Sequence, residues 1–217
     1  MSITISGGIT LNGGGWTIVA PPAGIRAIFG YGNPGTATAI TNLVSTTGIV
    51  ATDTTGVGTA RYGLAAAGYG TDKAIFGYGY ASPSARSITN LVSNTGVVAS
   101  DTTGVGTARN GLAAAGYGTD KAIFGYGVTY SPGFTPYSIT NLVSNTGVVA
   151  NDTTGVGTAR GTLAATGYGT DKAIFGYGTT GTVTAITNLV SNTGVVATDT
   201  AGVGTARLYL AAASYGS

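Results

Sequence analysis

Short apolar runs alternate along the chain with glycine-rich and polar turn segments, and no apolar stripe with the period of a helix runs through it. Runs of this kind, bounded by Gly, Asn, Asp and Ser, are typical of β-strands. The pattern predicts four strands in each of several similar units. In one complete unit the predicted strands are residues 64–69, 73–78, 88–93 and about 97–102.

These units are copies of one sequence. The motif Ile-Phe-Gly-Tyr-Gly begins at Ile28, Ile75, Ile123 and Ile174, so the repeats follow one another at steps of 47, 48 and 51 residues. Repeats of about 40–50 residues with four short strands are the signature of β-propeller blades. We therefore predict an all-β fold in which residues 26–217 form a propeller of four four-stranded blades.

The first strand type predicts how the ring closes. It is rich in Ala and Gly, which suits the crowded innermost position, and its last copy at residues 210–215 has no second strand after it. We expect residues 210–215 to pair beside residues 26–31, so that no sheet edge stays open. In the alternative, residues 16–20 fill this place in the first blade, and the C-terminal strand pairs elsewhere, for example with a second subunit.

Along the second strand, side-chain alternation predicts how blades pack. It places Phe76 and Tyr78 on one face of the sheet and Ile75 and Gly77 on the other. An aromatic face of one blade can thus fill the glycine-lined face of its neighbour.

Residues 1–25 lie outside the repeats and are predicted to form an N-terminal β arm for attachment or oligomerisation. Ile3 and Ile5, and then Ile9 and Leu11, alternate with polar residues on either side of two glycines, which indicates two short strands or a hairpin. With Trp16, Ile3 and Ile5 are the candidate anchoring residues. A plain capping strand on the first blade is the other interpretation.

The repeats also carry the features of a known family. Glycines end the second strand, as at Gly77 and Gly79, and an Arg precedes each first strand, at Arg61, Arg109, Arg160 and Arg207. In these features residues 26–217 resemble Kelch propeller blades. The N-terminal sequence Ser-Gly-Gly-Ile-Thr-Leu-Asn-Gly-Gly-Gly-Trp, joined to near-identical repeats, resembles small structural proteins of tailed bacteriophages, particularly those of cyanobacteria. This resemblance implies a virion protein.

The repeats differ mainly in two places. The segments between second and third strands, residues 33–39, 80–87, 128–138 and 179–185, share almost nothing, and the two residues after each repeat Arg also vary. Both places emerge on one face of a propeller, while the constant turns emerge on the other. We interpret the variable face as recognition loops, although drift of exposed loops explains the variation equally well. The candidate recognition residues are Tyr62, Tyr80, Arg86, Asn110, Tyr130, Phe134, Tyr137 and Tyr209.

Composition excludes several kinds of chemistry. The chain has no Cys and no His, so it offers no disulfide, no thiolate or imidazole metal ligand and no Ser/His or Cys/His catalytic pair. The Asp of each Asp-Thr-Thr-Gly turn, as at Asp101, supplies one carboxylate where calcium needs several oxygens. We interpret it as the cap of a tight turn or as the partner of the repeat Arg. We expect no catalytic residue, no metal site and no cofactor.

Charge and hydropathy limit the partners. A net charge of +2, with Lys and Arg scattered singly, predicts no nucleic-acid partner. No apolar run approaches the length of a membrane span, and the first residues lack the pattern of a secretory leader, so we expect no membrane insertion.

Together these patterns favour a non-enzymatic structural or adhesion protein of a bacteriophage virion, a component of the tail fibre, baseplate or capsid surface. We expect it to be made in the host cytoplasm, to form homo-oligomers, and to bind other virion proteins or a host-surface glycan. The alternative is a free lectin-like propeller that binds glycans in equivalent pockets between blades. Such a lectin should use Tyr and Asp of the constant elements, whereas an adhesin should use the unequal loops or the arm.

Overall fold

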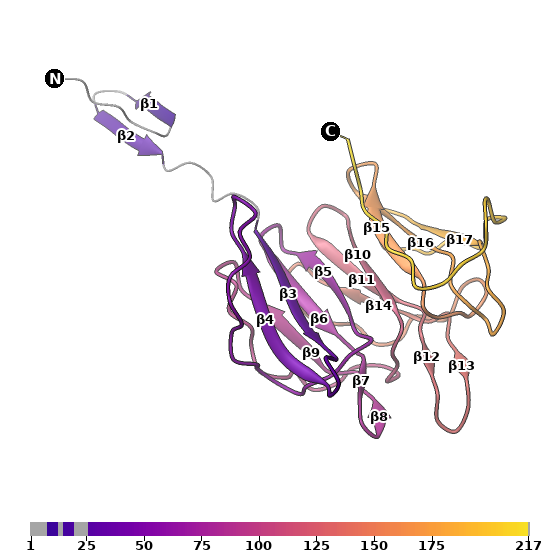
Figure 1. The fold of residues 1–217 in the computed structure, drawn as a ribbon. Coiled ribbons are helices and arrows are strands. Elements are labelled where there is room, and N and C mark those ends of the chain that lie inside the picture. Colours follow the sequence, from indigo (N-terminus) through magenta and orange to yellow (C-terminus); the bar gives the residue numbers. More distant parts are fainter. Residues whose placement is uncertain (1–7, 13–14, 20–25, 217) are drawn as a thin grey trace.

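A computed structural model describes residues 8–12, 15–19 and 26–216 (Figure 1). All regular elements in these ranges are β-strands, which confirms the predicted all-β class. No helix in the described ranges has the length and apolarity needed to cross a membrane. The strands belong to an N-terminal hairpin, to four small sheets that follow the repeats, and to two short loop hairpins.

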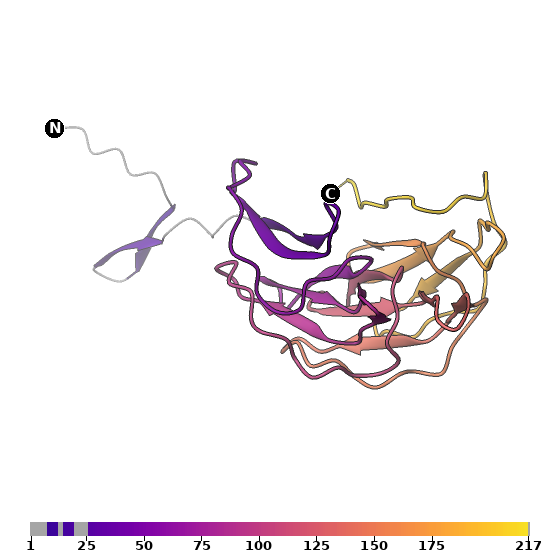
Figure 2. The same cartoon turned by 60° about the horizontal axis from the view of Figure 1, so that its bottom comes forward.

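The four antiparallel sheets, one for each repeat, follow one another around an arc (Figure 2). In the complete sheets the second strand of the repeat lies in the middle, as expected from hairpins joined in sequence. The first sheet contains β3 (Ala27–Gly32) and β4 (Thr38–Val44), and the second contains β5 (Ala65–Tyr69), β6 (Lys73–Gly77) and β9 (Thr89–Val92). The third contains β10 (Ala113–Tyr117), β11 (Lys121–Gly125) and β14 (Thr140–Val143), and the fourth contains β15 (Ala164–Tyr168), β16 (Lys172–Gly176) and β17 (Thr187–Val190).

The predicted fourth strand is reduced to isolated bridges. In the second repeat these join Val98 to Val92 and Thr102 to Thr89. Between them the NH of Ala99 donates to the main-chain oxygen of Leu91 at 2.8 Å, and Nδ2 of Asn90 donates to the main-chain oxygen of Ala99 at 3.0 Å. A side chain therefore satisfies the backbone where a fourth regular strand was expected.

The predicted ring closure is not formed in the structure. Residues 210–216 adopt no strand and are largely exposed, and β3 pairs with β4 alone among the described residues. The alternative closure by residues 16–20 is not formed either, because β2 (Gly15–Val19) pairs with β1 (Gly8–Asn12), with Trp16 opposite Leu11. The described hairpin thus begins at Gly8 and contains Ile9 and Leu11 of the predicted strands. Ile3 and Ile5 lie outside the described residues.

Neighbouring sheets pack through an aromatic ring against a glycine, as predicted. The ring of Phe124 in β11 covers Gly77 of the preceding repeat, where a Cβ atom would lie only 2.6 Å from the Cζ of the ring. The same ring meets the ring of Tyr78 edge-on at a centroid distance of 5.2 Å. Burial raises the pKa of Tyr78 to about 12, so this phenol is neutral near pH 7.

One detail of this packing was predicted wrongly. Tyr78 faces the following repeat, whereas Phe76 faces the preceding one and meets the ring of Tyr31. The two side chains lie on opposite faces because Tyr78 has a φ of +64°, outside the extended region, and this interrupts the alternation of the strand.

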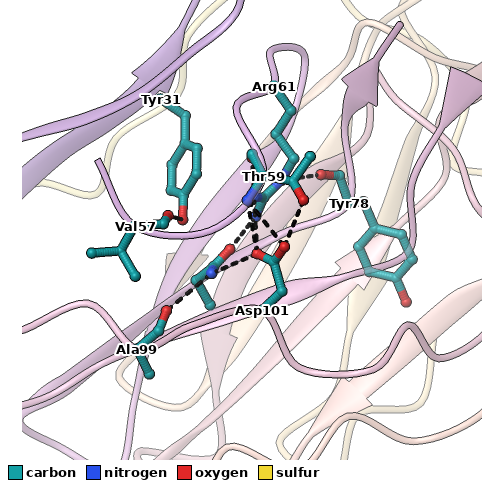
Figure 3. Close-up of polar contacts among 8 residues, drawn as sticks. Tyr31, Val57, Thr59, Arg61, Tyr78, Ala99 and Asp101 are labelled. Carbon is teal, nitrogen blue, oxygen red and sulfur yellow. Dashed lines mark hydrogen bonds and ion pairs between the residues drawn. The ribbon is translucent and has the colours of Figure 1, made fainter. Parts of the chain in front are cut away.

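A buried arginine joins each repeat to the next (Figure 3). Arg61 is fully buried, and its guanidinium lies 4.2 Å from the ring centroid of Tyr31. It donates to the main-chain oxygen of Tyr78 and to Oδ1 of Asn90, both at 2.7 Å. Arg109 and Arg160 repeat these contacts at the next two junctions. The guanidinium therefore reaches from the end of one repeat into the sheet of the following one.

Asp101 completes the junction, and of its two predicted roles the turn cap is wrong, whereas pairing with the repeat Arg is present. Its carboxylate accepts hydrogen bonds from the main-chain NH and hydroxyl of Thr59, at 3.0 and 2.6 Å, and from Nδ2 of Asn90 at 2.9 Å. Burial alone would raise the pKa of Asp101, but these hydrogen bonds outweigh it and lower the pKa below its ordinary value. The side chain holds the preceding repeat instead of capping its own turn. Arg61 lies at the ion-pair limit of 4.0 Å from it.

Candidate binding face

The variable loops begin where the second strand of each repeat ends. Gly79 has a φ of +101°, and a Cβ atom there would lie 2.9 Å from the main-chain oxygen of Tyr62, so glycine is required at this turn. The chain then forms the hairpin of β7 (Tyr80–Ala81) and β8 (Ser84–Ala85), and in the next repeat that of β12 (Val128–Thr129) and β13 (Thr135–Pro136). Both hairpins project from the same end of the sheets (Figure 1).

The constant turns lie together at the other end. Asn94 donates from Nδ2 to Oδ2 of Asp72 at 3.2 Å, which joins the turn after the third strand to the turn after the first. The same bond recurs between Asn145 and Asp120 at 3.1 Å. The predicted separation of a variable face from a constant face is therefore confirmed.

The two variable places of the sequence meet in the structure. After each of the first three repeat arginines, the next residue forms an antiparallel bridge to the start of the variable loop in the following sheet, so Tyr62 pairs with Tyr80 and Asn110 pairs with Val128. Main-chain bonds then link these positions across repeats, from the NH of Gly111 to the oxygen of Gly63 at 2.8 Å. The variable face is thus a continuous hydrogen-bonded surface rather than a set of separate loops.

A pocket of about 230 Å³ lies between the loops of the second and third repeats. Its walls come from both hairpins, and its base comes from the segment that joins the two sheets. The residues that line it are Tyr80, Ser84, Ala85, Ala108, Asn110, Thr129, Tyr130 and Ser131. It combines two aromatic rings with hydroxyl and amide groups, which is the composition of a site for a small polar ligand.

Asn110 lines this pocket and carries an unsatisfied buried group. Its side chain is 7% exposed, and its Oδ1 is buried without a hydrogen-bond partner among the described residues. A buried acceptor in this condition costs about 1–3 kcal/mol of stability. Because Asn110 lines the pocket, a rotation of its side chain that brought Oδ1 to a hydroxyl or amide donor of a ligand would recover that free energy.

Aromatic pairs flank the pocket. The rings of Tyr62 and Tyr80 lie 5.5 Å apart at 51°, and those of Tyr130 and Phe134 lie 5.8 Å apart at 51°. Burial raises the pKa of the Tyr130 phenol, and the nearby Tyr209 phenol raises it further. The Tyr130 phenol therefore stays protonated near neutral pH and can donate to a ligand.

Two of the predicted residues lie at the loop bases instead. Arg86 and Tyr137 each donate their main-chain NH at the loop return, to Gly79 and Gly127 respectively, and neither lines the pocket. The sequence analysis also missed several pocket residues. Serines of the two loops lie beside prolines in variable segments, which is a usable signal, whereas Ala108 is the same in the repeats and gives none.

A second, smaller pocket lies between the third and fourth repeats. Its volume is about 190 Å³ and its lining is made of small and aliphatic residues, namely Thr140, Leu142, Thr153, Thr154, Val156, Thr193, Gly194, Val195 and Val196. It offers no aromatic ring and no carboxylate. The equivalent inter-blade pockets expected of a lectin should contain both, so this pocket does not favour the lectin alternative.

Comparison with known proteins gives information about the fold alone. No protein-family model and no curated protein matches the chain. The structure is similar to the solved structure of YjhT, with a TM-score of 0.52 and 14% sequence identity. The similarity covers 70% of this chain and 48% of YjhT, so this chain corresponds to about half the length of that protein. At this identity the likeness concerns architecture and carries no chemistry.

Proposed function

We propose that this protein is a non-enzymatic recognition scaffold of a bacteriophage virion, a structural or adhesion component of the tail fibre, baseplate or capsid surface. Its four sheets act as Kelch-like propeller blades, and residues 210–216, from the same chain or from a second copy, supply the inner strand that the first sheet lacks. Residues 1–25 serve as the attachment arm. The variable face recognises a host surface or another virion protein.

The unsatisfied Oδ1 of Asn110 in the loop pocket carries the proposal. Apart from Ala108, the residues that line the pocket belong to segments that differ between repeats, so we expect one site where a repeated binding protein would have several. Rings of Tyr80 and Tyr130 give apolar faces with hydroxyl ends, and the amide gives a buried acceptor. This combination suits the alternating CH faces and hydroxyl groups of a sugar.

Binding to an array of bacterial surface polysaccharides tests the recognition function. The strongest partner on the array is then titrated calorimetrically against the wild type and against Asn110→Ala. We expect one site per chain and an affinity reduced about tenfold or more, because 1.4 kcal/mol corresponds to a factor of ten. Val97→Ala is the matched control, since Val97 is exposed away from the pocket.

Several equal sites per chain would favour the lectin alternative, and an unchanged affinity in Asn110→Ala would contradict the assigned pocket. The virion location has its own test. Antibodies against the chain should label intact phage particles in electron micrographs, and unlabelled particles would overturn that part of the proposal whatever the array shows.

A further inference from the structure

The two ends of the repeat array carry complementary halves of the junction that joins the repeats internally. The first sheet shows the side that normally faces a preceding repeat, and the fourth shows the side that normally faces a following one. Three internal junctions give the geometry of the complete contact. They are nearly identical, with Tyr–Phe centroid distances of 5.2, 5.2 and 5.1 Å.

The apolar half of the junction is divided between the two ends. The first sheet has an uncovered aromatic ring, and the fourth sheet has an uncovered glycine. Phe124 and Phe175 are fully buried on Gly77 and Gly125, whereas Phe29 at the first edge is 61% exposed. At the other edge, a Cβ atom on Gly176 would meet only Cγ2 of Thr187 at 3.3 Å. The surface of Gly176 is therefore open to a ring of the kind that Phe29 presents.

A second apolar pair shows the same complementarity. The side chains of Leu91 and Leu142 reach the turn glycine of the following repeat, where a Cβ atom would lie 2.8 and 2.9 Å from their Cδ2 atoms. At the fourth sheet the equivalent Leu189 is 42% exposed. At the first sheet the equivalent turn glycine, Gly48, has nothing within 4 Å of its Cβ position.

The donors of the polar half lie at the fourth sheet. Arg207 stacks on the ring of Tyr177 at 4.2 Å, in the same pose as the buried arginines of the internal junctions. Within the described residues its side chain donates only to the main-chain oxygen of Thr205, at 3.0 Å. The Nε and Nη2 bonds that Arg61 makes to Tyr78 and Asn90 have no counterpart there.

The matching acceptors lie at the first sheet. Asp53 occupies the place of Asp101, but in the part of the chain that the structure describes it accepts only Nδ2 of Asn42, at 2.8 Å. Thr205 occupies the place of Thr59, which donates twice to Asp101. In the described part of the chain the carboxylate at one end thus lacks the bonds from a neighbouring repeat that Asp101 accepts, and the guanidinium, hydroxyl and main-chain NH donors at the other end lack the matching acceptors.

These ends do not meet within one chain. The sheets follow the arc with β3 at one end and β17 at the other (Figure 2), and the exposed Phe29 shows that the fourth sheet does not cover the first. We propose that the first sheet of one copy docks on the fourth sheet of a second copy, through the contacts of the internal junctions. Residues 210–216 of that copy then lie beside β3, whose edge opposite β4 is unpaired among the described residues. Because the two surfaces differ, the contact is heterologous and can close into a ring.

Light scattering of the full chain over a wide range of concentration tests this association. We expect the mass to rise from one chain to a whole multiple of it. Gly176→Ala should abolish the rise in mass, because its methyl group would occupy the space that the ring of Phe29 fills. Phe29→Ala should abolish it as well, because it removes that ring. Gly133→Ala and Phe134→Ala are matched controls in an exposed loop of the third repeat and should associate like the wild type.

A mixture of the two edge variants distinguishes head-to-tail docking from any other association. Each variant keeps one intact edge, so Gly176→Ala mixed with Phe29→Ala should form a pair with a single junction, although neither associates alone. A wild type that stays a single chain at every concentration would overturn the proposal in favour of closure within the chain. Association that both edge variants retain would overturn it as well. Circular dichroism of each variant confirms that it is folded.

Discussion

The middle repeats and the outer repeats have nearly the same sequence and very different surroundings. Phe124 and Arg109 of the middle repeats are fully buried, whereas Phe29 is mostly exposed and Arg207 is exposed. The sequences around these residues are nearly the same, so the difference comes from the neighbouring repeat. In a repeat array each unit buries its faces only against adjacent units, and stability accordingly resides in the junctions.

The largest expected contrast concerns the arginines. Arg109→Ala leaves Oδ1 of Asn141 and the main-chain oxygen of Tyr126 without the donors that now lie at 2.8 and 2.6 Å. Removing one partner of such a buried charged network costs about 3–5 kcal/mol of unfolding free energy. Arg207→Ala removes an exposed side chain and should cost less than about 1 kcal/mol. Urea unfolding at the lowest usable protein concentration, where chains are separate, measures both.

Equal losses of unfolding free energy in the two arginine variants would contradict the view that the junctions between repeats stabilise the fold. Repeating the measurement at high concentration sharpens the comparison. If copies dock end to end, the cost of Arg207→Ala grows with concentration, while that of Arg109→Ala does not.

For the glycines of the second strand we expect a difference of intermediate size in the cost of substitution to unfolding free energy. A methyl group on Gly125 would lie 2.6 Å from Cζ of Phe175, so Gly125→Ala forces the ring or the sheet to move and should cost about 1–3 kcal/mol. Gly176→Ala meets only the methyl group of Thr187 and should cost less than about 1 kcal/mol in separate chains. Thermal unfolding followed by circular dichroism compares them. A larger loss at Gly176 would mean that the fourth sheet is already covered in dilute solution.

Much of the fold could be predicted from the sequence because the same pattern of apolar and turn residues recurs in every repeat. The positions of β5, β6 and β9 follow from apolar runs bounded by turn residues, and the aromatic fit on glycine follows from alternation. The orientation of Tyr78 could not be predicted, since a positive φ at a non-glycine residue depends on the packing of its ring and on Arg109. The role of Asp101 was also hidden, because its partner Thr59 belongs to another repeat.

The candidate site was predictable in its location and not in its chemistry. Variation between copies marks the loops around Tyr80 and Tyr130, and both line the pocket. The sequence cannot show that Oδ1 of Asn110 is buried without a partner, because that depends on a bridge to Val128 in the next sheet. Differences between repeats therefore locate a surface, while tertiary pairing decides which of its atoms remain available.

The smallest expected contrast concerns the junction carboxylates and depends on pH. Burial raises the pKa of Asp152, but hydrogen bonds from Thr107 and Asn141 outweigh it and lower the pKa below the ordinary value. A carboxyl group with a lowered folded-state pKa contributes stability that is fully present above its unfolded-state pKa of about 4 and is lost as pH falls through the folded-state pKa. Asp152→Asn should thus cost about 1 kcal/mol at pH 7 and progressively less in acid. Asp53→Asn, which changes a carboxylate that accepts only Asn42 in the described part of the chain, should cost less at pH 7. Urea unfolding at several pH values measures both, and a cost for Asp152→Asn that did not shrink in acid would show that the carboxylate acts through packing instead of charge.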